Sequence, residues 1–188
     1  FDYSRADNPT RQNLEKNITS LEGGLGAVAY SSGMAAISSI CQMFSAGDEF
    51  IFTNNVYGGT YRLMEKIMKR FNLKVKWIDT SIIKDVENAI SSKTKMIFIE
   101  TPTNPMMKLS DINAISSLAK NNQIMLVVDN TFMSPFFQRP LELGADIVVH
   151  SSTKYIGGHS DIIGGLVVVS RKNGKALEDL RFIQMSVG

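Results

Sequence analysis

Seven short apolar runs recur along the chain, and most of them alternate with segments of helical spacing. The runs are rich in β-branched and aromatic residues and lie at 26–32, 49–54, 74–79, 95–100, 124–130, 146–152 and 165–170. Such runs are typical of buried strands, and their alternation with helices predicts a mostly parallel sheet covered by helices on both faces. The pattern therefore indicates an α/β fold.

Three amphipathic segments have the spacing of helices. Apolar residues recur at helical intervals in residues 10–24 and two glycines follow, which predicts a helix with a C-terminal stop. Residues 58–72 and 110–122 have a similar period, and Ser110 is the expected N-cap of the second. No repeat, low-complexity tract or linker interrupts the pattern, so we expect a single domain over residues 1–188.

Composition narrows the class of protein. A chain of 188 residues with 44% hydrophobic content is long enough to bury one core. Its net charge of +2, with acids and bases interspersed, gives no basic patch for nucleic acid or an anionic membrane. No apolar run approaches the roughly 20 residues of a membrane span, and the chain does not open on a signal-peptide pattern. We therefore expect a cytoplasmic protein whose partners are small molecules or other protein chains.

Several short motifs suggest chemistry that their context excludes. Residues 24–29, GLGAVA, have dinucleotide-binding spacing but follow a helix and enter a strand, so we expect a loop. Residues 151–154 match S-x-x-K, yet the S-D-N and K-T-G elements that accompany this motif are missing. His150 and His159 have no partner at metal-ligand spacing, so no metal site is predicted, and His150 is interpreted as a strand-end hydrogen-bonding residue. The single cysteine, Cys41, has apolar neighbours and is expected to be a packed core thiol.

Polar residues follow the ends of five predicted strands. They lie at 31–33, 54–57, 100–104, 129–131 and 151–154. Because ligands in open parallel sheets bind outside the carboxyl ends of the strands, these segments are expected to converge on one cleft.

Lys154 lies in a loop of small residues, and the residues around the expected cleft offer what pyridoxal phosphate (PLP) needs. That cofactor requires an amine for its aldehyde, a carboxylate for its pyridine nitrogen, a cradle for its phosphate and a flat group against its ring. Lys154 is the candidate amine, although a solvated loop lysine would look the same. Asp129 ends a run in which an unpaired charge is costly, so its partner is either the protonated pyridine nitrogen or an internal arginine.

The phosphate cradle is expected from two segments. Ser32, Gly33 and Met34 follow a strand and open a helix, and amides in that position bind phosphate. Ser151 and Thr153 flank the lysine and can offer hydroxyls to the same phosphate, although such residues also form ordinary turns.

Two further residues fit the cofactor ring. Tyr57 precedes a double glycine, which allows a close backbone approach while the tyrosine ring stacks on a ligand. Asn104 lies between two prolines and can hydrogen-bond the ring hydroxyl. A core tyrosine and a proline-ordered turn would explain these two residues equally well.

The motifs as a set resemble those of the Cys/Met-metabolism family of fold-type-I PLP-dependent enzymes, the cystathionine synthases and lyases with their relatives. The resemblance runs along the whole chain through Y-S-R at 3–5, AYSSGMAA at 29–36, VYGGTYR at 56–62, ETPTNP at 100–105, VVDNTF at 127–132 and HSSTKYIGGHSD at 150–161.

The resemblance implies a role for each matched residue. Lys154 would carry the cofactor, Asp129 would pair with its ring nitrogen and Thr131 would pack near the other face of the ring; Lys154, Asp129 and Tyr57 would be the catalytic residues. Tyr3 and Arg5 would reach the cofactor phosphate of a neighbouring subunit, which implies a homodimer, commonly paired into a homotetramer.

The resemblance also implies an activity, the lysis of the carbon–sulfur bond of cystathionine or a related sulfur amino acid. Replacement at the γ carbon, as in cystathionine gamma-synthase or an O-acylhomoserine sulfhydrylase, is one alternative, and a non-catalytic domain of the same fold is another. Gly59 stands where methionine-specific lyases carry a cysteine, which favours the cystathionine-processing branch. Because family members are longer, we expect residues 1–188 to be a PLP-binding large domain, with the arginine for the substrate carboxylate in a C-terminal domain.

Overall fold

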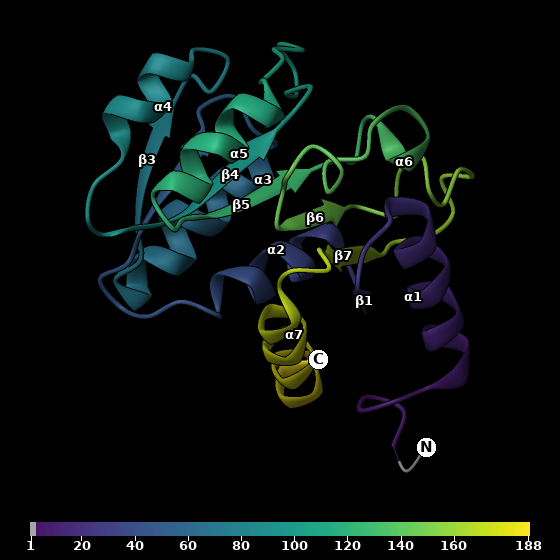
Figure 1. Ribbon diagram of the computed structural model, residues 1–188. Coiled ribbons are helices and arrows are strands. Elements are labelled where there is room, and N and C mark those ends of the chain that lie inside the picture. Colours follow the sequence, from purple (N-terminus) through teal and green to yellow (C-terminus); the bar gives the residue numbers. More distant parts are fainter. Residues whose placement is uncertain (1–2) are drawn as a thin grey trace.

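Each predicted apolar run contains one strand in the computed structural model, which describes residues 3–188 (Figure 1). The strands are β1 (Gly26–Tyr30), β2 (Glu49–Thr53), β3 (Lys74–Ile78), β4 (Thr94–Glu100), β5 (Met125–Asp129), β6 (Ile147–His150) and β7 (Gly165–Val169). They form one sheet in the order β1-β7-β6-β5-β4-β2-β3.

The sheet is parallel except at one strand. Four neighbouring pairs are parallel, namely β3 with β2, β2 with β4, β4 with β5 and β5 with β6. By contrast, β7 runs antiparallel to both β1 and β6. In the parallel register Glu100, the last residue of β4, lies opposite Asp129, the last residue of β5. The predicted α/β fold with a mostly parallel sheet is confirmed, and the sheet brings two acidic residues side by side at its carboxyl edge.

Helices cover both faces of the sheet (Figure 1). On one face lie α2 (Gly33–Cys41), α7 (Gly174–Val187) and the helical segment that starts with α3 (Gly58–Arg62). On the other lie α1 (Pro9–Glu22), α4 (Ile83–Ala89) and α5 (Ile112–Asn121), and a short helix, α6 (Ser134–Phe137), follows β5.

Side-chain alternation along the buried strands explains the two cores. Val127 packs in the cluster that includes α2 and α7, whereas its neighbour Val128 packs with α4 and α5. Each fully buried aliphatic side chain of this kind contributes about 1.5–3 kcal/mol of transfer free energy. Cys41 is fully buried in the first core, as predicted, and burial raises the pKa of its thiol to about 12.

All three predicted helices are present, but the N-cap of one differs from the prediction and another is irregular. α1 stops at Gly23, whose φ of 72° is left-handed, as expected. The predicted loop over residues 24–29 is shorter than expected, because only residues 24 and 25 connect α1 to β1, which already begins at Gly26. The N-cap of α5 is Asp111, not Ser110, because the Asp111 carboxylate accepts the Ala114 amide. The segment 58–72 is helical but irregular, since α3 continues into a π-helical turn (Leu63–Ile67) and a 3₁₀ turn (Met68–Phe71).

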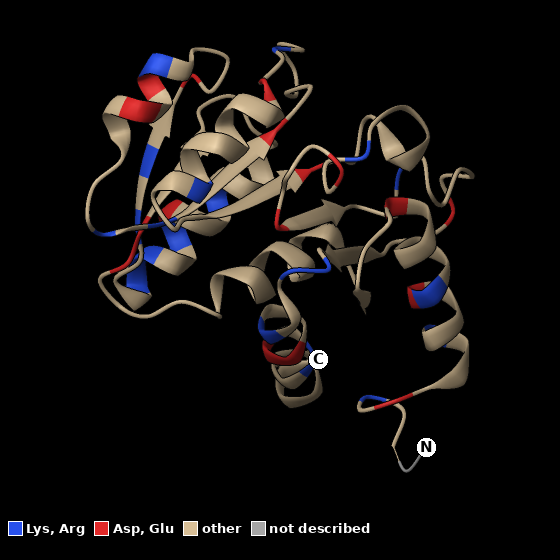
Figure 2. Ribbon diagram, viewed as in Figure 1, with Lys and Arg blue, Asp and Glu red and all other residues tan. Residues whose placement is uncertain are grey.

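Charged residues of both signs are intermixed on α1, α4 and α7 (Figure 2). Within residues 3–188, no helix combines the length and the apolar character that a bilayer crossing requires.

Candidate cofactor site

A cavity of about 270 Å³ opens at the carboxyl ends of β4, β5 and β6, beside the start of α2. Ten of the twelve residues predicted to form the site line it, and they come from every one of the five strand-end segments. They are Ser32, Gly33, Met34, Tyr57, Asn104, Asp129, Thr131, Ser151, Thr153 and Lys154. The apolar side chains of Ile37, Pro102, Phe132, Val149 and Ile163 also line the cavity.

The start of α2 presses closely against the turn after β6. Ser32 caps the helix, and its hydroxyl accepts the Ala35 amide at 3.0 Å. The amides of Gly33 and Met34 belong to the first turn, where a helix offers its N–H groups no internal acceptor. A Cβ atom on Gly33 would lie 2.9 Å from the Cβ of Ser151, so only glycine permits this approach. The result is a concave group of free amides beside the Ser151 hydroxyl.

Thr131 holds Asp129 and ties two strand ends together. Asp129 Oδ1 accepts the Thr131 amide at 3.0 Å and the Thr131 hydroxyl at 2.5 Å, and the same hydroxyl oxygen accepts the Ser151 amide at 2.9 Å. Burial raises the pKa of Asp129, although the bonds from Thr131 act in the opposite direction. Within residues 3–188 no arginine or lysine forms an ion pair with Asp129, so the internal-arginine alternative is not what the structure contains.

A second acid, Glu100, lines the cavity and was not singled out from the sequence. Its carboxylate accepts the amides of Tyr57 and Asn104, both at 2.9 Å. Burial, and secondly the neighbouring Asp129, raise the pKa of Glu100 to about 7. The signal was present in the sequence, because Glu100 ends an apolar run just as Asp129 does.

The turn that carries Lys154 is closed by its own backbone. The Lys154 amide donates to Ser151 O at 3.1 Å, and the Gly158 amide donates to Lys154 O at 2.8 Å, while the lysine side chain is exposed at the cavity wall. The Thr153 hydroxyl donates to Gly164 O at 3.2 Å and accepts the Gly164 amide at 3.1 Å. Thr153 thus closes the base of this loop in addition to lining the cavity.

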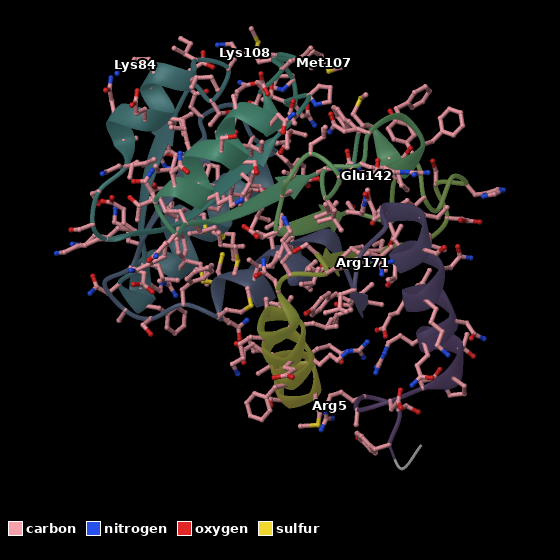
Figure 3. All side chains as sticks on the ribbon, in the orientation of Figure 1. Arg5, Lys84, Met107, Lys108, Glu142 and Arg171 are labelled. Carbon is pink, nitrogen blue, oxygen red and sulfur yellow. The ribbon has the colours of Figure 1, made fainter. Side chains whose placement is uncertain are left out.

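Tyr3 and Arg5 lie outside the cavity of their own chain. Arg5 Nε donates to Met185 O at 2.9 Å, so Arg5 lies beside the end of α7 (Figure 3). Its guanidinium carbon lies 4.9 Å from the centre of the Tyr3 ring, and Tyr3 is exposed. Their predicted role concerns a neighbouring subunit and stays a prediction.

His150 is a buried hydrogen-bonding residue at the end of β6, as interpreted from the sequence. Its Nε2 lies 2.5 Å from Glu22 Oε1, and both side chains are fully buried. Neither residue of the pair is among those that line the cavity.

The whole chain is similar to known proteins. The family model described as Cys/Met metabolism PLP-dependent enzyme matches residues 1–188. A cystathionine gamma-lyase of Bacillus subtilis (strain 168) is 50% identical over 188 residues, which are 100% of this chain and 49% of that protein. A cystathionine gamma-synthase/O-acetylhomoserine (thiol)-lyase of the same strain is 48% identical over 100% of this chain and 50% of that protein.

The fold is also similar to a solved structure of a cystathionine gamma-lyase. The crystal structure of cystathionine gamma-lyase from Lactobacillus plantarum complexed with L-serine matches with a TM-score of 0.97 and 45% identity, covering 100% of this chain and 49% of that one. The chain spans about half the length of the curated relatives it matches. The expected resemblance is therefore confirmed, and the chain belongs to the family of Cys/Met metabolism PLP-dependent enzymes.

Proposed function

We propose that the protein containing this chain is a PLP-dependent lyase that cleaves the carbon–sulfur bond of cystathionine or a related sulfur amino acid. The observation that carries the proposal is that Lys154, Asp129 and the start of α2 line one cavity in a chain of this family. Residues 1–188 would be the PLP-binding large domain of a longer protein. The protein would act in the cytoplasm as a homodimer or homotetramer, with Tyr3 and Arg5 reaching the neighbouring subunit's cofactor.

The lining of the cavity fits PLP in three chemical respects. The free amides at the start of α2, with the Ser151 hydroxyl beside them, suit a phosphate group. Asp129 offers a carboxylate that forms no ion pair with an arginine or lysine of residues 3–188, which suits a protonated ring nitrogen. The exposed Lys154 amine at the cavity wall suits an aldehyde. Tyr57 and Asn104 would bind the ring from the remaining sides.

The mechanism that follows assigns proton transfers to Lys154. When bound, PLP supplies the electron sink for the pair released at the substrate α carbon. The Lys154 amine, once displaced from the cofactor by the substrate amine, would take the α proton as a general base and return a proton on the departing side. Asp129 would keep the ring nitrogen protonated, and Tyr57 would assist the departure of the sulfur group. With one water molecule consumed, which supplies the keto oxygen, the products would be a thiol, ammonia and a 2-oxo acid.

Replacement at the γ carbon is the second candidate, because it needs the same early steps. The two Bacillus subtilis relatives carry a lyase name and a synthase name at 50% and 48% identity. A non-catalytic domain is disfavoured, since assembly alone places no demand on Lys154 or Asp129.

Product analysis separates the candidates. The whole protein would be supplied with cystathionine, with methionine, and with an activated homoserine ester plus cysteine. Pyruvate or 2-oxobutyrate from cystathionine would support the lyase, and cystathionine formed from the ester would favour the synthase. Faster turnover of methionine than of either would contradict the proposal.

Covalent labelling tests the assignment of Lys154 directly. Borohydride reduction of the loaded protein, followed by peptide mapping, should leave the pyridoxyl group on Lys154. A Lys154→Arg variant keeps the charge but removes the reactive amine, and it should carry no label. A label on another lysine would contradict the assignment.

A further inference from the structure

Glu100 is an acid that the proposed mechanism does not use, although it stands inside the cavity. It is the last residue of β4, its side chain is only 7% exposed, and it lies opposite Asp129 in the register of β4 and β5. Strand alternation points Glu100 and Asp129 to the same face of the sheet. Two carboxylates therefore share one side of the cavity.

The two oxygens of Glu100 hold two different turns. Oε2 accepts the Tyr57 amide at 2.9 Å, and Oε1 accepts the Asn104 amide at 2.9 Å. Tyr57 belongs to the turn between β2 and α3, whereas Asn104 belongs to the turn that follows β4. Both bonds favour the ionised carboxylate, since they act on the pKa of Glu100 in the direction opposite to burial. The carboxylate thus clamps together two turns that are 43 and 4 residues away from it in the chain.

Packing alone does not account for an acid at this position. Burying a carboxylate costs free energy, and an apolar side chain of similar size fills the same space without that cost. Here the cost is increased by the neighbouring Asp129, whose charge opposes the ionisation of Glu100. What only an acid supplies is a pair of acceptors directed at two amides. A further bond between the same two turns, from the Met106 amide to Asn55 Oδ1 at 3.1 Å, shows that their mutual position is fixed in more than one place.

We propose that Glu100 is a positioning residue whose carboxylate sets the spacing between Tyr57 and Asn104, and thereby the place of the cofactor ring between them. The inference rests on the proposed function, because it assumes that Tyr57 and Asn104 bind PLP. Glu100 acts through the backbones of these two residues and need not touch the cofactor.

The test compares Glu100→Gln and Glu100→Ala with a matched control in the whole protein. Glutamine keeps the shape but replaces one acceptor by an NH₂ group, so one amide loses its partner; alanine removes both acceptors. Glu49→Gln is the control, because Glu49 is also a partly buried hydrogen-bonding acid but accepts from Ser91, Thr94 and Lys76 at the start of β2.

The first readout is hydrogen exchange of the Tyr57 and Asn104 amides in the cofactor-free protein. Loss of a hydrogen bond of this kind should speed exchange by about tenfold, at one amide in Glu100→Gln and at both in Glu100→Ala. The second readout is the dissociation constant of PLP together with the circular dichroism of its visible band, which reports how the ring is held. We expect binding about tenfold weaker in Glu100→Gln, weaker still in Glu100→Ala, and an altered band in both.

The outcomes are distinguishable. Unchanged exchange at both amides in Glu100→Ala would overturn the inference, as would faster exchange with an unchanged cofactor affinity and band. Equal effects in Glu49→Gln would also overturn it, because they would indicate a general loss of stability. A wild-type protein that binds no PLP would overturn the proposed function, and this inference with it. A normal wild-type band with unchanged Glu100 variants would overturn this inference alone.

Discussion

Two groups of acidic and polar residues lie at the same edge of the sheet but on opposite faces, and they differ in what neutralises them. The open cluster consists of Glu100, Asp129 and Thr131 and lines the cavity. The closed cluster consists of Glu22, Asn130, Gln138 and His150, and three of its members are fully buried. Because Asp129 and Asn130 are neighbours in the chain, strand alternation sends them to opposite sides.

In the closed cluster only one oxygen of the acid is bonded from within the protein, because Glu22 Oε2 and His150 Nδ1 have no hydrogen-bond partner within residues 3–188. Glu22 Oε1 contacts His150 Nε2 at 2.5 Å and accepts from Asn130 Nδ2 at 3.0 Å, and Asn130 and Gln138 bond each other. In the open cluster the acceptors meet only amides and one hydroxyl within residues 3–188. Both clusters contain a glutamate and uncharged polar residues, so residue type alone does not identify the ligand site. What marks it is that the acids line a cavity and form no ion pair with a lysine, arginine or histidine of residues 3–188, because such acids are suited to a cationic ligand group.

The largest expected effect comes from Asp129→Asn, which removes one of the two acids of the open cluster, the one proposed to pair with the ring nitrogen of PLP. The variant would break the proposed pair between Asp129 and the protonated ring nitrogen of PLP. Breaking a buried ion pair costs about 3–5 kcal/mol, so the activity of the whole protein should fall by about a hundredfold or more. Stability of the cofactor-free protein should hardly change, because asparagine still accepts the bonds from Thr131. The measurements are the activity of the whole Asp129→Asn protein and the unfolding of its cofactor-free form, and activity within a few-fold of the wild type would refute the role of Asp129.

Glu22→Ala should give the opposite pattern, with a loss of stability. Removing this side chain leaves His150 and Asn130 without their buried acceptor, which should lower the free energy of unfolding by about 3 kcal/mol. Glu22→Gln keeps a carbonyl oxygen for both donors and is the matched control, with a smaller loss. Denaturant unfolding measures the difference, and two variants of wild-type stability would show that the closed cluster is not structural.

The sequence predicts more of the open cluster than of the closed one, in which it indicates only that His150 forms hydrogen bonds at a strand end. Lys154 and Asp129 were found because each stands at the end of an apolar run, where the sheet exposes its ligand-binding edge. Glu22 was missed because its partner His150 is 128 residues away and no local pattern links them. Glu100 ends an apolar run as Asp129 does, but its role is not visible in the sequence, because its two bonds go to backbone amides.

Local errors have similar causes. The apolar run of β7 predicts a strand but carries no information on its direction, which the long loop from Ser151 to Gly164 leaves open. Ser110 and Asp111 are adjacent and both are good N-cap residues, so composition alone cannot choose between them. In the structure the Ser110 hydroxyl instead bonds the Thr80 hydroxyl at 2.7 Å.

A smaller effect should appear in the pH dependence of stability. The pKa of Glu100 is raised to about 7, first by burial and then by Asp129. An acid with a raised pKa contributes stability that is fully present below its unfolded-state pKa and is lost as the pH rises through the folded-state pKa. Between about pH 4.5 and pH 7 the cofactor-free wild type should therefore lose stability relative to Glu100→Gln, by at most about 1.4 kcal/mol per pH unit.

Denaturant unfolding of the two proteins across this range measures that difference. An Asp129→Asn background provides the control, since it removes the neighbouring charge and should bring the pKa of Glu100 closer to its ordinary value. Parallel stability curves for wild type and Glu100→Gln would contradict the prediction.

The smallest effect is expected from Gly59→Ala, because it adds one methyl group beside the Tyr57 ring that lines the cavity. A Cβ atom on Gly59 would lie 2.4 Å from Cε1 of Tyr57 and 2.9 Å from Sδ of Met34, so Gly59→Ala should push the Tyr57 ring out of position. Overpacking of this kind costs about 1–3 kcal/mol, and the lower end is expected because the Tyr57 ring is 49% exposed and has room to turn. PLP should bind about tenfold more weakly, as measured by titration of its visible band. Gly58→Ala is the matched control, because its Cβ would meet only the flexible end of Arg62 at 3.4 Å; equal affinities in the two variants would mean that the position of the ring does not limit binding.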